Sequence, residues 1–524
     1  MKIDIKIKVK LFFFRYFFDF NIEQEFIYLI TINPNLLPNL IIKFMKKPNF
    51  KIYALTALLV GFYSCNSNDE VVTDSATAAS QFKVINVTHH DGHPFSTGKS
   101  ANLTTGKYVA NPGGGVMMQA FYWDVPAGGT WWNTVGTKVT EWSNAGIGSI
   151  WLPPVSKAQN GPFSMGYDPT DYFDFGDYNQ NGTTETRFGS KTELVSLITK
   201  AHTENMQVYA DMVLNHNSGG QLENNPFTGT QTYTNFAGVA SGKFPRTNAD
   251  FYKNSFGNND EGAFGGFPDL CHAAPNVQSW LWQRTDGVGK YYKNTMKFDG
   301  WRFDYVKGFG PWVVNNWNAN VGGFSVGEYW DSNVNTLEWW ANNANSSVFD
   351  FACYYKMNDA FDGNNLALLN DDMMWKRNPY KAVTFVSNHD TDEIWKKELA
   401  YAYILTHEGY PTIFYRDYEE WLNKTKMNNL IWIHNNKATG TTSILYADND
   451  EYVARRNGYN GNPGLVVYIN NSSVWQERWI QTNWTNAQIK DFTGNSTWFP
   501  TTQGDKWVKI QCPPNGYSVW SINM

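Results

Sequence analysis

The sequence predicts an α/β protein, built on an eight-stranded (β/α)8 TIM barrel with a small excursion domain after strand 3 and a C-terminal antiparallel β domain. Short apolar runs alternate with helical patterns over residues 113–427, which is typical of parallel strands joined by crossover helices. One connection, residues 215–275, is far longer than ordinary loops and has no good helical pattern. From residue 428 to residue 524, alternating strands are separated by turn signals such as Asn515-Gly516.

The eight predicted barrel strands are short runs of apolar and β-branched residues. They are Val116–Tyr122, Gly148–Leu152, Gln207–Leu214, Gly300–Phe303, Gly323–Gly327, Ser347–Phe351, Ala382–Ser387 and Thr412–Tyr415. Helical spacing between them is clearest over Trp131–Asn144, Ser190–Asn205 and Glu393–Thr406. Gly146 follows the first of these helices, and Gly409 and Pro411 follow the last, as expected of helix ends.

The composition predicts two or three structural units and leans toward a carbohydrate ligand. A chain of 524 residues is too long for one small domain. The net charge is −6 and no basic stripe is present, which argues against nucleic acid as a partner. The 23 Trp residues are consistent with sugar binding, because flat rings match the C–H faces of sugars, although any single Trp more simply fills a core.

The N-terminal residues do not carry the signals of a folded domain. Residues 1–64 read as an upstream extension and a signal segment: a basic stretch begins at Met45, and an apolar run over Ile52–Phe62 ends just before Cys65. This run is too short to cross a bilayer as a helix. The pattern resembles a bacterial lipoprotein signal, with translation from Met45 and a lipidated Cys65 attached to a membrane. The alternative is an ordinary secretory signal with an incidental Cys65.

Residues 65–112 are rich in Ser, Thr, Asn and Gly, so we expect a tether between that segment and the barrel. In both interpretations of the signal the protein is exported, either as a cell-surface or outer-membrane lipoprotein or as a secreted protein. Four cysteines in so long a chain do not form a disulfide scaffold. Cys353 and Cys512 could form a single bridge, which the sequence alone does not decide.

Four segments each place charged or imidazole side chains within or directly after a short apolar or β-branched run. They are Asp211–His216, Gly300–Gly308, Val326–Trp330 and Phe385–Asp390. A buried strand has this appearance when its carboxyl end delivers a polar side chain into a site, and sites of barrels lie at those ends. We therefore expect these segments to meet at one end of the barrel.

The carboxylates of these segments are candidates for acid–base and nucleophilic chemistry. Arg302 and Asp304 are two residues apart on a strand and share a face, so the guanidinium should lower the pKa of Asp304. Glu328 is followed by Tyr329 and Trp330, which can shield it and raise its pKa. Three carboxylates, including Asp390, beside an Arg and two His match the needs of a retaining glycosidase. The alternative for each carboxylate alone is a structural ion pair.

In this order, the four segments resemble the α-amylase family of glycoside hydrolases, over Gly113 to Met524, with the archaeal and plant enzymes as the most similar pattern. The resemblance implies that Asp304, Glu328 and Asp390 are catalytic. It also implies that His216 and His389 contact sugar hydroxyls and that Asp211 supports Arg302. Further substrate contacts are implied for Tyr167, which would stack on the reacting sugar, and for Lys307 on the leaving-group side. The long connection would be a small domain beside the cleft.

A calcium ion is also implied. Asn215, Asp260 and Asp269 offer hard oxygen ligands, which Ca²⁺ prefers and Zn²⁺ does not. In the family pattern the backbone carbonyls of Gly262 and Gly308 complete the site. Asp260 and Asp269 could instead cap turns. A second, zinc-like site seen in some relatives is not expected here, because its positions read Tyr252, Gly257 and Cys271.

The resemblance predicts an exported, retaining, endo-acting α-amylase that hydrolyses internal α-1,4 bonds of starch, glycogen or maltooligosaccharides. Several alternatives stay open at this point: a transglycosylase or a maltooligosaccharide-forming enzyme of the same fold, a non-catalytic glucan-binding surface lipoprotein, and a structural or interaction protein. Loss of a catalytic carboxylate would favour the binding protein, and all three are present. The oligomeric state does not follow from the sequence, and we expect a monomer.

Overall fold

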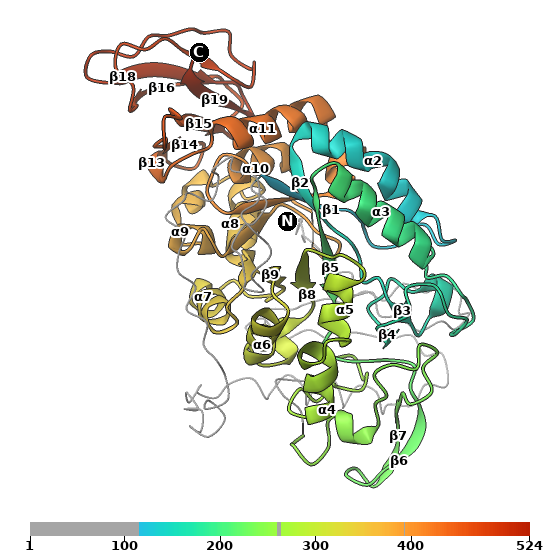
Figure 1. The fold of residues 1–524 in the computed structure, drawn as a ribbon. Helices are drawn as coiled ribbons and strands as arrows, with labels where there is room; N and C mark the ends of the chain where they lie inside the picture. The colour runs from blue at the N-terminus through green and yellow to red at the C-terminus, as the bar shows by residue number, and fades with distance from the viewer. Residues whose placement is uncertain (1–114, 259–263, 392, 524) are drawn as a thin grey trace, which may run out of the picture. The chain divides into compact units, whose positions relative to one another are not determined.

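Eight parallel strands close into a barrel in the computed structural model, which describes residues 115–258, 264–391 and 393–523. The order around the barrel is β1-β12-β11-β10-β9-β8-β5-β2, with every pair parallel. Figure 1 shows the connecting helices lying around these strands. The strands are β1 Val116–Gln119, β2 Ile147–Trp151, β5 Gln207–Met212, β8 Gly300–Phe303, β9 Phe324–Gly327, β10 Ser347–Phe349, β11 Ala382–Phe385 and β12 Tyr410–Phe414. Each lies within or beside a predicted strand, so the predicted fold class is confirmed. The predicted signal segment and tether lie outside the described residues.

The helices between the strands follow the predicted boundary signals in most places. They are α2 Trp131–Ala145, α3 Lys191–Thr203, α4 Pro275–Gln278, α5 Val288–Asn294, α6 Trp312–Asn320, α7 Val334–Asn343, α8 Phe351–Phe361, α9 Met374–Arg377, α10 Lys397–Ile404 and α11 Lys424–Lys437. Helix α2 ends at Gly146 with φ 96°, and α3 begins with a capping box between Ser190 and Glu193. Among the described residues, no helix is long and apolar enough to cross a membrane.

Helix α10 begins later than predicted. The sequence pattern placed its start at Glu393, whereas the helix starts at Lys397. The single backbone N–H of Trp395 donates to both carboxylate oxygens of Asp362, at the end of α8, at 3.1 Å to Oδ1 and 3.0 Å to Oδ2. These contacts hold the residues just before α10 against the end of α8, so those residues do not join helix α10.

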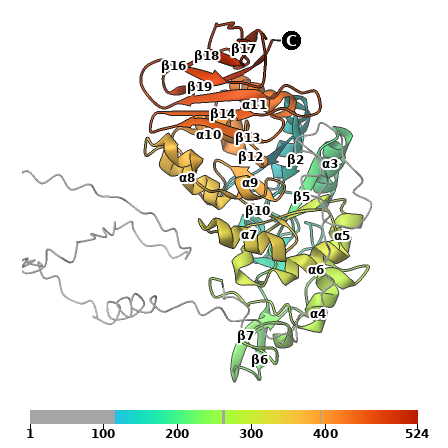
Figure 2. The same cartoon turned by 90° about the vertical axis from the view of Figure 1, so that its left-hand side faces the viewer.

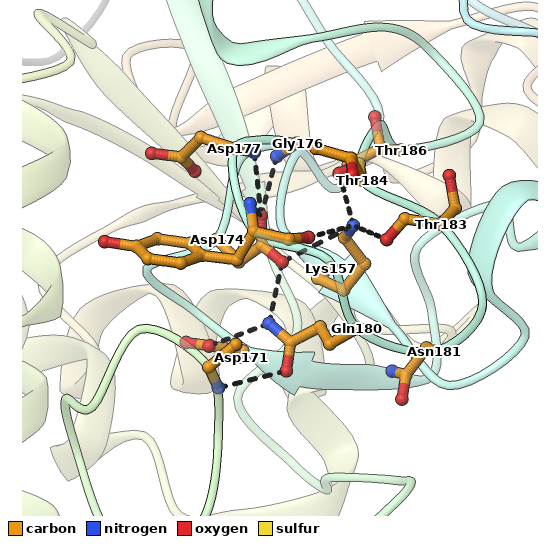
Figure 3. A network of polar contacts seen from close by, with 12 residues as sticks. Lys157, Asp171, Asp174, Gly176, Asp177, Gln180, Asn181, Thr183, Thr184 and Thr186 are labelled. Carbon is orange, nitrogen blue, oxygen red and sulfur yellow. Dashed lines mark hydrogen bonds and ion pairs between the residues drawn. The ribbon is translucent and has the colours of Figure 1, made fainter.

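The residues that precede the third barrel strand are organised by a buried lysine. Lys157 begins the short strand β3 (Lys157–Ala158), which pairs with β4 (Pro169–Asp171). Its ammonium donates to the carbonyl of Tyr178 at 3.1 Å and of Thr183 at 3.0 Å, and lies 3.4 Å from Asp174 Oδ2. Figure 3 shows the oxygens of Asp174 and Thr183 directed at this nitrogen. Since β3 and β4 frame residues 159–168, this network fixes the segment that carries Tyr167.

The excursion between β5 and α4 contains no α-helix in its described part. Its main element is the hairpin of β6 (Gln221–Asn225) and β7 (Thr230–Asn235). Ser241 joins the excursion to the β3–β4 region, because its hydroxyl donates to Asp171 Oδ1 at 2.7 Å and its backbone N–H donates to Asp171 Oδ2 at 3.0 Å. The excursion is therefore tied to the same loops that hold Tyr167.

A five-stranded antiparallel sheet and a separate two-stranded ribbon form the C-terminal region (Figure 2). The sheet has the order β13-β14-β15-β19-β17, and the ribbon pairs β16 with β18. The strands are β13 Thr442–Ala447, β14 Glu451–Arg456, β15 Leu465–Asn470, β16 Gln476–Gln481, β17 Ile489–Asp491, β18 Trp507–Cys512 and β19 Gly516–Ile522.

Two sequence-based expectations about this region need correction. The β domain does not start at residue 428, because helix α11 continues to Lys437 and buries Leu430, Ile431 and Ile433. The strands begin at Thr442. The bridge considered between Cys353 and Cys512 is not formed, since both are free, buried thiols.

Gly327, the last residue of β9, allows a tryptophan to pack directly on the strand. A Cβ at this position would lie 2.1 Å from a ring carbon of Trp340, which is fully buried. The next residue is Glu328, so this close contact also fixes the backbone that presents that carboxyl group. Gly136 in α2 differs, because a Cβ there would meet no atom within 4 Å.

We predict opposite effects of adding a methyl group at these two glycines. Gly327→Ala should lower the melting temperature, because overpacking a core costs about 1–3 kcal/mol. Gly136→Ala should raise it, since glycine in a helix interior costs about 0.5–1 kcal/mol relative to alanine. Calorimetry measures the melting temperatures of the two variants and of the unaltered protein under the same conditions. An unchanged melting temperature for Gly327→Ala would contradict the packing described.

Candidate active site

The four polar segments meet at one end of the barrel, as predicted. Strands β5, β8 and β9 are neighbours, with Asp211 paired to Arg302 and Phe303 paired to Gly327. Asp304 and Glu328 directly follow those last two residues, so their backbones lie side by side at the carboxyl ends of the strands. His389 and Asp390 follow β11 at the same end.

The guanidinium of Arg302 is the centre of the site. Its Nη1 donates to Asp211 Oδ1 at 2.9 Å and to Asp304 Oδ1 at 2.7 Å. Its Nη2 lies 2.6 Å from Glu328 Oε1. The guanidinium carbon also lies 5.0 Å from the ring centre of Trp151. One buried cation therefore contacts three buried carboxylates from three adjacent strands.

Asp211 is held on several sides. Besides Arg302, its Oδ2 accepts hydrogen bonds from Trp151 Nε1 at 3.0 Å and from the hydroxyl of Tyr167 at 3.0 Å. These donors come from β2 and from the loop before β4. The carboxylate thus has the contacts needed to keep Arg302 in one orientation.

The protonation of Asp304 differs from the sequence-based expectation. Burial raises the pKa of Asp304 to about 6, against the opposing effect of Arg302 and with a further upward contribution from Asp211. The prediction that Arg302 lowers the pKa of Asp304 is therefore wrong, because the net shift is upward. The sequence shows that Arg302 is near, but it does not show that one cation serves three carboxylates away from water.

Glu328 behaves as expected. Burial raises its pKa, Arg302 opposes that rise, and the negative charge of Asp304 adds to it. The backbone N–H of Tyr305 donates to Glu328 Oε2 at 3.0 Å. Tyr305 has a left-handed backbone conformation with φ 43°, which is unusual for a residue with a side chain. This bend aims the N–H at the carboxyl group, and no sequence signal indicated it.

A stack of three rings lies beside the carboxylates. Tyr167 stacks on His389 with 5.4 Å between ring centres, and Trp123 stacks on both, at 5.9 and 6.3 Å. The hydroxyl of Tyr167 lies 2.9 Å from His389 Nε2, and Gln119 Nε2 lies 2.9 Å from His389 Nδ1. Sequence reasoning missed Trp123 and Gln119. The polar Gln119 at the end of the apolar strand β1 was the available signal.

His389 and Asp390 form an ion pair. His389 Nε2 lies 3.0 Å from Asp390 Oδ2. Burial disfavours the charge on each, but their mutual attraction prevails, so the pKa of Asp390 is lowered and the pKa of His389 is raised. Asp390 is therefore the most readily ionised of the three candidate catalytic carboxylates.

His216 is one of the first residues of the excursion that follows β5. Its Nε2 is 2.9 Å from the carbonyl oxygen of Tyr167. Phe264 and Phe267 stack against its ring, each with 5.0 Å between centres. Burial lowers the pKa of His216 to about 4, so the imidazole is neutral at pH 7.

Lys307 lies at the edge of the site. Its ammonium is 3.6 Å from Asp331 Oδ2 and 5.2 Å from the ring centre of Tyr329. It remains partly exposed, so it could turn toward a ligand.

The expected calcium ligands are partly outside the described residues, since Asp260 and Gly262 fall there. Asn215 Oδ1 is buried and accepts no hydrogen bond from a described residue. A Cβ on Gly308 would lie 1.9 Å from that oxygen, so the two residues are in close contact. The carbonyl of Asn215 accepts from Leu270 N–H at 2.8 Å, which brings Asp269 next to the same strand end. A buried amide oxygen without a hydrogen-bond donor among the described residues has the ligand chemistry that a hard cation prefers.

Among the described residues, no three acidic, His or Cys side chains gather as a metal site. This finding concerns side chains of those types and does not include Asn215 or backbone carbonyl oxygens. Cys271, from the zinc-like pattern, is a buried thiol whose pKa is raised by burial.

Comparison of the chain with known proteins finds α-amylases by family model, by sequence and by structure. Residues 465–521 match the family model described as α-amylase C-terminal. The α-amylase of Geobacillus stearothermophilus is 29% identical over 494 residues, spanning 79% of this chain and 88% of that protein. The α-amylase of Bacillus licheniformis is 30% identical over 392 residues, spanning 62% of this chain and 73% of that protein. A solved Anoxybacillus α-amylase shares the fold with a TM-score of 0.60 at 18% identity, covering 78% of this chain and 97% of that one.

We predict that removing the central cation destabilises the protein in a pH-dependent manner. Breaking a buried ion pair by removing one partner typically costs about 3–5 kcal/mol. In Arg302→Gln the remaining carboxylates should have pKa values raised further above those of the unfolded chain. The free-energy cost of these charged, buried carboxylates is full above their folded-state pKa values. It decreases as the pH falls below those values and is gone below the unfolded-state pKa values, because both states are then protonated.

The melting-temperature deficit of Arg302→Gln should therefore be smaller at pH 5 than at pH 8. The control is Arg284→Gln, which removes an exposed pair with Asp286 and should leave the melting temperature unchanged at both pH values. An equal deficit at the two pH values would show that carboxylate repulsion is not the cause.

Proposed function

This chain belongs to the α-amylase family of glycoside hydrolases, and we propose that it hydrolyses internal α-1,4-glucosidic bonds of starch or glycogen with retention of configuration. The observation that carries the proposal is the placement of Asp304 and Glu328 on the two nitrogens of one guanidinium. Carboxyl groups of a retaining pair lie about 5–5.5 Å apart, whereas an inverting pair needs about 6.5–9.5 Å to fit a water. A shared guanidinium favours the shorter separation.

Glu328 is the general acid and base in this proposal. Its raised pKa favours a proton at the start of the reaction, which it gives to the glycosidic oxygen as the bond to the leaving sugar breaks. After the leaving sugar departs, the carboxylate takes a proton from water, and that water attacks the glycosyl group. The Tyr305 N–H holds the other carboxylate oxygen during both steps.

Asp304 is the nucleophile. A pKa of about 6 leaves it mostly ionised at pH 7, so its oxygen can bond to the anomeric carbon and form a covalent glycosyl intermediate. Arg302 orients the carboxylate through the 2.7 Å hydrogen bond. Asp390, kept ionised by His389, supplies negative charge and hydroxyl contacts close to the oxocarbenium-like transition state.

The remaining polar groups bind the sugar. Tyr167, backed by Trp123, offers a flat ring for the reacting glucose. His389 and the neutral His216 can donate to or accept from hydroxyls, and Lys307 stands at the edge for the leaving-group side. An exported enzyme, as the segment before Cys65 predicts, would meet such polymers outside the cell.

We also propose a structural calcium ion held by Asn215, Asp269 and the Gly308 carbonyl, with Asp260 and Gly262 as further ligands from outside the described residues. The buried Asn215 oxygen in contact with Gly308 supports this assignment. When bound, the ion supplies charge that ties the excursion to the segment after β8. It takes no part in bond cleavage.

We expect endo-acting hydrolysis of soluble starch. Cleavage of internal bonds shortens the polymer quickly, so iodine colour should fall while few reducing ends have formed. The measurement follows both quantities in the same digest. Slow colour loss with early release of one short product would instead indicate a maltooligosaccharide-forming enzyme, and products longer than a maltoheptaose substrate would indicate transglycosylation.

The assignment of roles predicts the stereochemistry of the product. Proton NMR at early times should show the α-anomer as the first product. Glu328→Gln should lower kcat about 10²–10⁴-fold, because it removes the proton source while keeping the shape. Asp304→Asn should lower it at least as much, and the exposed Asp286→Asn serves as the unaffected control. Initial release of the β-anomer, or a near-normal rate for Asp304→Asn, would refute the roles.

Calcium removal should destabilise the protein. A ligand that binds only the folded state stabilises it by about 2.7 kcal/mol at a hundredfold excess over Kd. A chelator should lower both the melting temperature and the activity, and added calcium should restore both. In Asn215→Ala the melting temperature should respond less to calcium. A chelator without effect on the unaltered protein would count against the ion.

A further inference from the structure

The two-stranded ribbon of β16 and β18 has one buried face and one unusual outer face. Ile480, Val508 and Ile510 point inward and belong to the core of the C-terminal region. An outer face that meets water is normally polar along an antiparallel pair. Here it carries two tryptophans, Trp479 and Trp507, whose residue surfaces are 52% and 39% exposed.

The two tryptophans lie on the same face of the ribbon. Trp479 is paired with Lys509, and Trp507 is paired with Gln481, so the two rings occupy diagonal positions on neighbouring strands. Diagonal neighbours lie roughly 7–8 Å apart and can be covered together by one ligand. Single exposed apolar residues are normal on a protein surface, whereas neighbouring ones that form a contiguous patch are typical of a binding site.

The charges on this face cancel. Lys509 forms an ion pair with Glu477, which is the next outward position along β16 from Trp479. The exposed amide of Gln481 lies beside Trp507. The face therefore combines two aromatic rings and an amide without net charge, which suits a neutral ligand rich in hydroxyl groups.

The ribbon is remote from the proposed active site. Figure 1 places β16 and β18 in the C-terminal region, at the opposite end of the picture from β8 and β9, and Figure 2 shows the same ribbon far from the barrel strands β5 and β10. A molecule on the ribbon would therefore not occupy the carboxylate site. A long polymer could instead be held at the ribbon while another part of it, or another chain of the same granule, is cleaved.

We propose that Trp479 and Trp507 form a second α-glucan-binding site, a platform that attaches the enzyme to polymeric or granular starch. This inference rests on the proposed function for the identity of the glucan. A second copy of the chain fits less well as the occupant. Six residues on each of two strands give a face of roughly 200 Å², far below the ~800 Å² per partner of stable interfaces.

The test separates binding from catalysis. Trp479→Ala/Trp507→Ala is prepared with and without Asp304→Asn, and Trp339→Ala, an exposed tryptophan on α7, is the matched control. Co-sedimentation with granular starch uses the proteins that carry Asp304→Asn. The double variant should bind at least fivefold more weakly, and the control should bind as the protein without tryptophan substitutions does. Hydrolysis of granular starch should fall in parallel, while kcat/KM on maltoheptaose stays within a factor of two.

Melting temperatures check that the variants fold. If the double variant melts early, the two single variants replace it, and each should give a partial loss of binding. Undiminished granule binding by every folded variant would overturn the platform. So would a concentration-dependent dimer that the substitutions abolish without any effect on granule binding.

Failure of the platform and failure of the proposed function give different results. An unaltered protein that cleaves maltoheptaose but does not bind granules overturns the platform and leaves the function in place. A protein that binds granules through the two tryptophans but cleaves no glucan supports the platform and overturns the hydrolase assignment.

Discussion

The site depends on one buried guanidinium that must satisfy three carboxylates at once. Arg302 contacts Asp211, Asp304 and Glu328, which stand on three adjacent strands of the barrel. A buried cation needs such partners, and buried carboxylates need the cation, so each fixes the others. Burial raises the pKa values of Asp304 and Glu328, and the opposing effect of the one guanidinium does not reverse that rise for either group. These raised pKa values suit the acid and nucleophile roles that we propose for Glu328 and Asp304.

Close packing around the strand ends supports this arrangement. Gly327 allows Trp340 to lie against β9 immediately before Glu328, and Gly308 allows Asn215 to approach the segment after β8. On the opposite side, Trp123, Tyr167 and His389 stack as a block, and the buried Lys157 holds the loop that carries Tyr167. The positions of the carboxylates therefore rest partly on buried residues outside the site, such as Trp340 and Lys157.

The barrel and the polar strand ends were predictable because both are local patterns. A short apolar run and the charged residue after it are adjacent in sequence, so Arg302, Asp304, Glu328 and Asp390 could be identified directly. Contacts between distant residues were not predictable, as shown by Gln119 and His389, which are 270 residues apart. The predicted direction of the pKa shift of Asp304 was wrong for the same reason, since burial and shared partners are properties of the fold. The start of α10 depends on Asp362, and the strands begin after α11, which local composition did not reveal.

The central claim is that Asp304, held by Arg302, forms a covalent bond to the sugar. The most direct test is to trap that bond with a 5-fluoro-α-glucosyl fluoride, which slows the second step, and to locate the label by peptide mass spectrometry. We predict one glucosyl unit attached to the peptide that contains Asp304, and none in Asp304→Asn. A label on another carboxylate, or turnover without any trapped intermediate, would contradict the claim.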